Sequence, residues 1–222
     1  MKQLKTPLVV LNFKRYTEAT GKNAVRLALI CRDVSKETGI SIVAVPQLLD
    51  ICPVAEVGIP VFAQHIDVAP QAAAQGGSTG HVLAEAVRDA GAIGTLINHS
   101  VQRLTLAEID AAIQAARRTG IATIVCSNNI ATTKAAAALK PDFVAIEPLE
   151  LIGTGIPVST ADPEIVSGAV DAARGIDPDV MVLCGAGISK KEMGTNPYSV
   201  DSDADESCYA VYSVCNASGY EI

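Results

Sequence analysis

The chain has 222 residues, of which 49% are apolar and 18% charged, so it can bury a large core, and this composition argues against disorder. A formal net charge of −7 and the lack of any apolar run of membrane-spanning length argue against nucleic acid and membrane as partners. The six cysteines are scattered without a C-x-x-C pair, which favours reduced thiols in the cytoplasm over a disulfide framework.

Seven short runs rich in β-branched residues recur along the chain and predict strands. Most are apolar throughout, which is typical of strands that are buried on both faces. The seven runs are Leu8–Asn12, Ile42–Val45, Val61–Gln64, Thr95–Asn98, Thr123–Cys126, Phe143–Ile146 and Met181–Cys184.

Amphipathic patterns predict helices in most of the gaps between these runs. One helix should begin at a capping box of Thr105 and Glu108, whose side chains accept hydrogen bonds from the free N–H groups of a first turn. Another should begin at Asp162-Pro163, because proline has no N–H group that a first turn would leave unpaired. Each predicted helix ends at a glycine. The predicted buried faces are Leu27, Ile30, Cys31 and Val34 before Gly39; Leu83, Ala86, Val87 and Ala90 before Gly91; Leu106, Ile109 and Ile113 before Gly120; and Val166, Ala169, Val170 and Ala173 before Gly175.

This alternation of strands and helices predicts parallel βαβ units and therefore an α/β fold. A doubly wound sheet would have the same rhythm, but no G-x-G-x-x-G follows the first strand, where Asn12-Phe13-Lys14 stands instead. We therefore predict a (β/α)8 barrel formed by residues 1–222 as a single domain. It would be compact, since such barrels typically need about 250 residues.

Polar side chains stand at the ends of four of these apolar strands. In a barrel, the C-terminal ends of the strands meet at one rim, so these side chains should converge there. They are Asn12 and Lys14, Gln64 and His65, Asn98 and His99, and Glu147.

Several segments resemble those of the triosephosphate isomerase family, in its short archaeal form, over roughly Leu8 to Lys190. Asn-x-Lys combined with Glu-Pro and Ile-Gly-Thr-Gly is the specific combination. The matching segments are Asn12-Phe13-Lys14, Ala63-Gln64-His65, Thr79-Gly80-His81, Asn98-His99-Ser100, Ala145-Ile146-Glu147-Pro148, Ile152-Gly153-Thr154-Gly155 and Gly185-Ala186-Gly187.

The resemblance implies a TIM barrel that interconverts dihydroxyacetone phosphate and D-glyceraldehyde 3-phosphate in glycolysis and gluconeogenesis. Glu147 would move a proton between C1 and C2, and His99 would polarise the carbonyl as a neutral electrophile. Lys14 would offset phosphate and enediolate charge, and Asn12 would orient the substrate. Proton abstraction beside a carbonyl needs one base and donors for the developing oxyanion, so no metal or organic cofactor is expected.

The same resemblance assigns substrate-binding positions. Pro148 to Val158 would form a lid that excludes water, because the enediolate phosphate otherwise eliminates phosphate. The remaining binding residues, besides Asn12 and Lys14, would be Ile152, Gly153, Gly185, Gly187, Ala217 and Ser218.

Two stretches depart from the family pattern. Val101 stands where the family carries glutamate, which indicates either a damaged site or a chain that has repacked around Val101. After about residue 190 the segment is atypical: Gly194, Pro197 and an acidic stretch interrupt any helix. Tyr209–Val214 could form strand eight, so residues 190–222 are either a divergent closure of the barrel or an unrelated segment.

Three functions remain open from the sequence. The leading one is an active isomerase. The second is a catalytically impaired homologue that still binds phosphorylated metabolites or other subunits, and the third is another phosphate-binding barrel enzyme. The polar loop from Gln71 to Thr79 matches a family segment that reaches into a neighbouring subunit, so we also expect a homo-oligomer, either a dimer or a tetramer.

Overall fold

The protein's structure, a computed structural model, describes residues 4, 7–68, 79–151, 161–185 and 208–213. Eight parallel strands form one sheet in the order β2-β1-β8-β7-β6-β5-β4-β3. The strands are β1 (Leu8–Asn12), β2 (Ser41–Val45), β3 (Phe62–Ala63), β4 (Gly94–Ile97), β5 (Ala122–Ser127), β6 (Phe143–Ile146), β7 (Met181–Cys184) and β8 (Cys208–Ser213).

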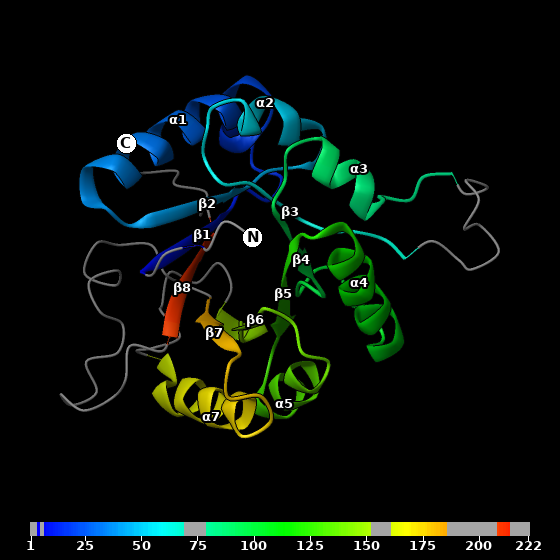
Figure 1. The fold of residues 1–222 in the computed structure, drawn as a ribbon. Helices are drawn as coiled ribbons and strands as arrows, with labels where there is room; N and C mark the ends of the chain where they lie inside the picture. Colours follow the sequence, from blue (N-terminus) through cyan, green and yellow to red (C-terminus); the bar gives the residue numbers. More distant parts are fainter. Residues whose placement is uncertain (1–3, 5–6, 69–78, 152–160, 186–207, 214–222) are drawn as a thin grey trace.

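The two outer strands of this order, β2 and β3, approach each other and complete a barrel. Ala44 and Val61 form an isolated parallel bridge, and the Ala44 N–H donates to the Pro60 carbonyl at 2.9 Å. Figure 1 shows the strands as a ring with the helices around it. The predicted barrel is therefore confirmed, and β8, which pairs with both β1 and β7, shows that the C-terminal segment contributes a strand to it.

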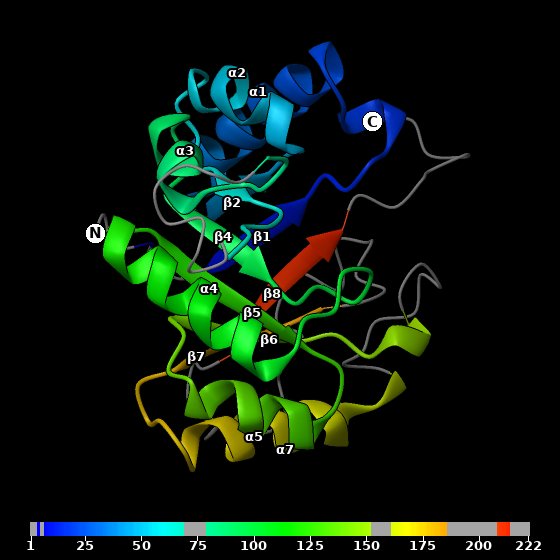
Figure 2. The same ribbon diagram turned by 90° about the vertical axis from the view of Figure 1, so that its right-hand side faces the viewer.

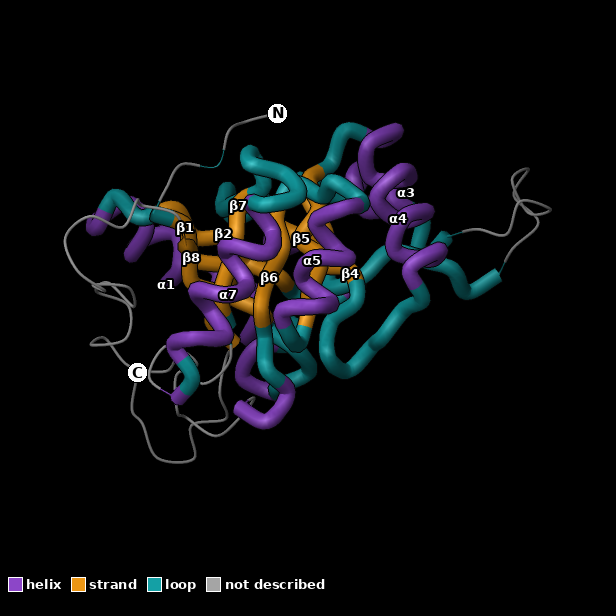
Figure 3. Tube along the Cα trace, turned by 90° about the horizontal axis from the view of Figure 1, so that it is seen from below, coloured by secondary structure: helices purple, strands orange, loops and turns teal. Residues whose placement is uncertain are grey.

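Helices cover the outside of the ring. Figure 2 shows α4 crossing the outer side of the sheet and α5 packed beside α7, and in Figure 3 the strands lie between helices. No described helix is long and apolar enough to cross a membrane. The helices are α1 (Lys22–Thr38), α2 (Ile51–Ala55), α3 (Ala84–Asp89), α4 (Leu106–Thr119), α5 (Ile130–Ala138) and α7 (Pro163–Arg174), with short 3-10 turns η1 (Thr17–Ala19), η2 (Leu48–Asp50) and η4 (Leu149–Leu151).

The predicted helix ends are confirmed where a specific residue defines them. Thr105 and Glu108 form the capping box of α4, and the Asp162 carboxylate caps α7 by accepting from the Ile165 N–H at 3.0 Å. Gly39 and Gly120 adopt left-handed conformations with φ of 74° and 76°, which glycine adopts without a side-chain clash.

Part of the predicted helix faces was wrong. In α1 the residues that pack on the sheet are Ala24, Ala28 and Cys31, whereas Ile30 and Val34 are exposed. Leu83, Ala86 and Leu106 are likewise exposed. Small side chains let a helix approach the sheet closely, so alanines occupy the contact and the larger apolar residues lie at its margin. The helices α2 and α5 were not predicted.

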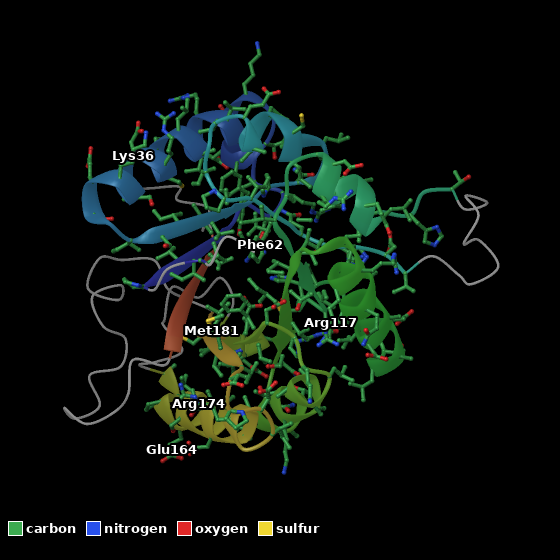
Figure 4. All side chains as sticks on the ribbon, viewed as in Figure 1. Lys36, Phe62, Arg117, Glu164, Arg174 and Met181 are labelled. Atoms are coloured by element: carbon green, nitrogen blue, oxygen red, sulfur yellow. The ribbon has the colours of Figure 1, made fainter. Side chains whose placement is uncertain are left out.

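Two apolar layers surround the strands and explain their uniformly apolar sequences. The inner layer fills the barrel and is built from alternate strand residues, such as Leu8, Val10 and Phe62. The outer layer joins the intervening strand residues to the helices. In Figure 4, Phe62 lies within the ring of strands, whereas Lys36 and Glu164 lie on the outer helices. Both faces of strands β1 to β7 are thus covered, as expected for a parallel barrel.

Candidate active site

The strand alternation decides which polar residues face the barrel axis. Because successive side chains alternate between faces, the series that starts with an inward residue continues inward to the strand end. On β1 the inward residues Leu8 and Val10 are followed at the same spacing of two by Asn12, and Phe62 of β3 is followed by Gln64. In the same way Glu147 follows the inward residues Phe143 and Ala145 of β6, and Gly185 follows Leu183 of β7. These polar ends and Gly185 therefore lie together at the C-terminal rim of the barrel.

Glu147 and His99 form the centre of this rim. Glu147 follows β6 and His99 follows β4, and they are only 4% and 8% exposed. The His99 Nε2 atom lies 3.7 Å from the Glu147 Oε2 atom, too far for a hydrogen bond. Among the described residues, that Oε2 has no hydrogen-bond partner. A buried carboxylate oxygen with unused acceptor capacity is suited to take a proton from a bound molecule.

Two neighbours confine the Glu147 carboxylate. Cys126 lies on β5, the strand that pairs with β6, and burial together with the negative charge of Glu147 raises the pKa of Cys126 well above its ordinary value. Cys126 therefore carries a protonated, neutral thiol. On the other side, a Cβ atom placed on Gly185 would lie 2.9 Å from both Cγ and Oε1 of Glu147. Glycine at this position leaves the room that the carboxylate occupies.

The surroundings of His99 favour its neutral form. The Val101 N–H donates to Nδ1 at 3.4 Å, which leaves the proton of the neutral ring on Nε2, facing Glu147. Burial lowers the pKa of His99 below its ordinary value; the Glu147 carboxylate opposes this, and the charges of Lys14 and Arg103 add to the lowering. His99 is thus a neutral N–H donor near neutral pH.

Lys14 joins the site through the segment after β1. Its backbone is left-handed with φ of 50°, and its N–H donates to the Asn12 Oδ1 atom at 3.0 Å. Its positive charge contributes to the lowered pKa of His99, so the ammonium lies within electrostatic reach of the imidazole. The site therefore combines a carboxylate, a neutral imidazole and an ammonium, which can take a proton, polarise a carbonyl and offset negative charge.

Asn98 supports the loop that carries His99. Its Nδ2 donates to the Cys126 carbonyl at 2.9 Å, and its Oδ1 accepts from the Leu104 N–H at 2.8 Å. Within this loop Val101 is 83% exposed. Val101 therefore fills no apolar gap, and the hypothesis that the chain has repacked around it is wrong.

Not every predicted residue lies at this centre or within the described chain. His65, a predicted rim residue, pairs with Asp67 at 2.7 Å in the loop after β3. Ile152, Gly153, Gly187, Ala217 and Ser218 lie outside the described residues. Within the described ranges, no group of three or more His, Cys, Asp or Glu residues could hold a metal ion.

Cys126 is the site residue that our sequence interpretation missed, because it was assigned only as a buried thiol. The spacing of Ala122, Ile124 and Cys126, each two residues apart, could have identified it, because this spacing places Cys126 on the inward face of β5. The pairing of β5 with β6 sets Cys126 beside Ala145, two residues before Glu147.

Comparisons with known proteins agree with this arrangement. The family model "Triosephosphate isomerase" matches residues 7–201. Triosephosphate isomerase of Methanosarcina mazei is 57% identical over 188 residues, which are 84% of this chain and 83% of the relative. That of Methanocaldococcus jannaschii is 54% identical over 187 residues, 83% of each chain. The crystal structure of triosephosphate isomerase from Bartonella henselae is similar in fold, with a TM-score of 0.69 and 17% identity over 94% of this chain and 92% of that one.

Proposed function

Since this chain belongs to the triosephosphate isomerase family, we propose that it interconverts dihydroxyacetone phosphate and D-glyceraldehyde 3-phosphate at the rim that holds Glu147 and His99. The reaction moves one proton between neighbouring carbons through an enediolate. The geometry that supports it is the buried pair of a carboxylate and a neutral imidazole, 3.7 Å apart on two different strands.

In the proposed mechanism Glu147 is the base. Its carboxylate takes a proton from C1 of dihydroxyacetone phosphate and returns it to C2, while the proton of the C1 hydroxyl passes to the C2 oxygen, so that C1 becomes the aldehyde and C2 the alcohol. The Nε2–H of neutral His99 donates to the carbonyl oxygen on which negative charge develops. A neutral donor suits this role because an imidazolium close to Glu147 would stabilise the carboxylate and weaken it as a base.

Lys14 and Asn12 complete the proposed machinery. The Lys14 ammonium would offset the charge of the phosphate and the enediolate. The Asn12 carboxamide would orient the substrate, and it also accepts a hydrogen bond from the Lys14 N–H. Gly185, together with Ile152, Gly153, Gly187, Ala217 and Ser218, is proposed to bind the phosphate by the resemblance described above. Backbone N–H groups of such glycine-containing segments are suited to phosphate oxygens.

A coupled assay tests this function directly. The purified chain is mixed with D-glyceraldehyde 3-phosphate, and the dihydroxyacetone phosphate formed is followed with glycerol 3-phosphate dehydrogenase and NADH. The chain and a Glu147→Gln variant are both prepared from a host that lacks its own isomerase, so that contamination is measured. Turnover by the chain but not by the variant is expected, and equal rates from both would contradict the proposal.

A catalytically impaired homologue is not favoured, although Val101 replaces the family glutamate. The base, the electrophile and the lysine are all retained, and the loop that carries Val101 still holds His99 through its backbone N–H. The side chain of Val101 is exposed, so either valine or glutamate can occupy this position without a steric clash.

The lowered pKa of His99 predicts how activity depends on pH. As pH falls, protonation of the imidazole replaces a neutral donor by a cation beside Glu147, and turnover should fall with it. Because the folded-state pKa is lowered from 6.5, this loss should occur below pH 6.5 rather than at it. The acidic limb of kcat/KM against pH, measured for the free enzyme, checks this. A limb at or above pH 6.5 that matches the His99 titration would contradict the assignment.

We also propose that the chain is a homo-oligomer. Three exposed apolar residues lie on the segments that follow the neighbouring strands β2 and β3, and we call them the rim patch: Leu48, Leu49 and Leu83. Leu49 is 90% exposed, an arrangement more typical of an interface than of a solvated loop.

Leu49→Glu should therefore raise the monomer fraction in light scattering at micromolar concentration, because it places a charge in the proposed interface. Ile176→Glu is the control, since Ile176 is an exposed apolar residue between α7 and β7, at the other end of the strands. The control should keep the parent assembly. A parent protein that is monomeric would refute the proposal.

We also propose where the protein is located in the cell and how many domains it has. We infer a cytoplasmic location from the cysteines, because Cys31, Cys52 and Cys126 are free thiols, as is usual in reducing compartments. We also infer that residues 1–222 form a single domain, because β8 in the C-terminal segment pairs within the same sheet as the first strands.

A further inference from the structure

Lys14 is held in a backbone conformation that lysine rarely adopts. Its φ of 50° lies in the left-handed region, where a Cβ atom crowds the following backbone. Such a conformation persists only when surrounding contacts hold it. The Lys14 N–H bond to Asn12 Oδ1 is one such contact, but it leaves the Lys14 carbonyl to be fixed by another group.

Gln64 supplies that second contact. Its Nε2 atom donates to the Lys14 carbonyl at 3.0 Å and to the Val45 carbonyl at 3.2 Å, and it lies 3.4 Å from Asn12 Oδ1. The two carbonyl oxygens can only accept hydrogen bonds, so the nitrogen end of the carboxamide must face them. The Gln64 side chain, just after β3, therefore contacts the end of β2 through Val45, the end of β1 through Asn12, and the backbone of Lys14.

We propose that Gln64 is a positioning residue for Lys14: its carboxamide fixes the left-handed backbone that directs the ammonium into the site. The inference rests on the proposed role of Lys14 in isomerisation. Without the carboxamide the Lys14 peptide relaxes toward an ordinary conformation and the ammonium shifts away from the substrate and from His99.

Methionine at position 64 is the test variant, because it keeps the length of the side chain and removes both donors. Gln64→Met should lower kcat/KM by about 10- to 100-fold, since displacements near 1 Å can cost about 10²-fold in rate. The pKa of His99, followed by NMR titration, should rise, because the Lys14 charge that lowers it moves away. A residue that supports only the fold would not move this value.

A double-mutant cycle separates positioning of Lys14 from general damage. In a Lys14→Met background, Gln64→Met should change kcat/KM by less than about threefold, because contacting residues that act through one group are not additive. Equal fold-losses in the two backgrounds, or no loss in the parent, would overturn the proposal. If Lys14→Met alone leaves kcat/KM unchanged, the proposed role of Lys14 fails instead, and the two failures are thereby distinguished.

Gln47→Met is the matched control. The Gln47 Nε2 atom also donates a hydrogen bond near the rim, to Thr20 Oγ1 at 2.9 Å, but it touches neither Asn12 nor Lys14 in the described hydrogen bonds. This variant should keep the parent kcat/KM and the parent pKa of His99. A loss as large as that of Gln64→Met would mean that any lost amide contact at the rim has the same effect, which would also overturn the proposal.

Discussion

Replacing Glu147 with aspartate should lower kcat by about 100-fold or more while the protein stays folded. The shorter side chain withdraws the carboxylate by about one methylene from the reacting carbon, and misplacement near 1 Å can cost about 10²-fold in rate. The position is buried, so the carboxylate has little freedom to make up the distance. Steady-state kinetics with D-glyceraldehyde 3-phosphate, together with the melting temperature, measure both effects.

Glu37→Asp is the appropriate comparison for this variant. Glu37 lies in the last turn of α1, is exposed, and undergoes the same chemical change. Its kcat should equal that of the parent. Parent-like turnover by Glu147→Asp would remove Glu147 from the role of base.

Adding one methyl group at Gly185 should have an effect of similar size, although it changes no polar atom. The Cβ atom of Gly185→Ala would lie 2.9 Å from Cγ and Oε1 of Glu147 and 3.3 Å from Cδ. Real Cβ atoms essentially never approach other atoms this closely, so the carboxylate must shift from its place. We expect kcat to fall by about 100-fold, following the same sensitivity to displacement.

Gly168→Ala shows whether crowding alone explains such a loss. The new Cβ would lie even closer to a neighbour, 2.6 Å from Ile130 Cδ1, but that atom is the end of a partly exposed, flexible side chain. Gly168 also lies within α7, where alanine is favoured by roughly 1 kcal/mol. This control should retain parent kcat, and unchanged kcat in Gly185→Ala would show that Glu147 tolerates displacement.

Much of the fold could be predicted because its signals are local. A β-branched run such as Phe143–Ile146 marks a strand directly, and the cap of α4 is defined by the two side chains that make it. The inner faces of helices were harder to predict. In α1 the pattern favoured Ile30 and Val34 because they are more apolar than alanine, yet alanines make the contact. Hydrophobicity alone does not report how closely a helix must approach a sheet.

The α5 helix was missed for a related reason. Its sequence is rich in alanine and has no apolar stripe, and its capping box pairs Asn129 with Thr132 instead of with a glutamate or glutamine. Its stability comes from packing beside α7, which no local pattern contains.

The sequence likewise predicts some of the site residues and not the contacts between them. Glu147, His99 and Lys14 could be predicted as rim residues because each follows an apolar strand. The grip of Gln64 on Lys14 could not, because it joins residues 50 positions apart and depends on a backbone angle that the sequence does not show.

The barrel has one weakly joined seam, between β2 and β3, where a single bridge of Ala44 and Val61 stands in place of a ladder. Segments with few backbone contacts open first when a protein is warmed. Gln64 lies on the β3 side of that seam and grips β1 and β2 on the other. We therefore expect that thermal opening at the seam releases Lys14 while the rest of the ring stays paired. Loss of activity on heating should then precede loss of helical structure, so that the seam, and not the core, would set the highest temperature at which the protein works.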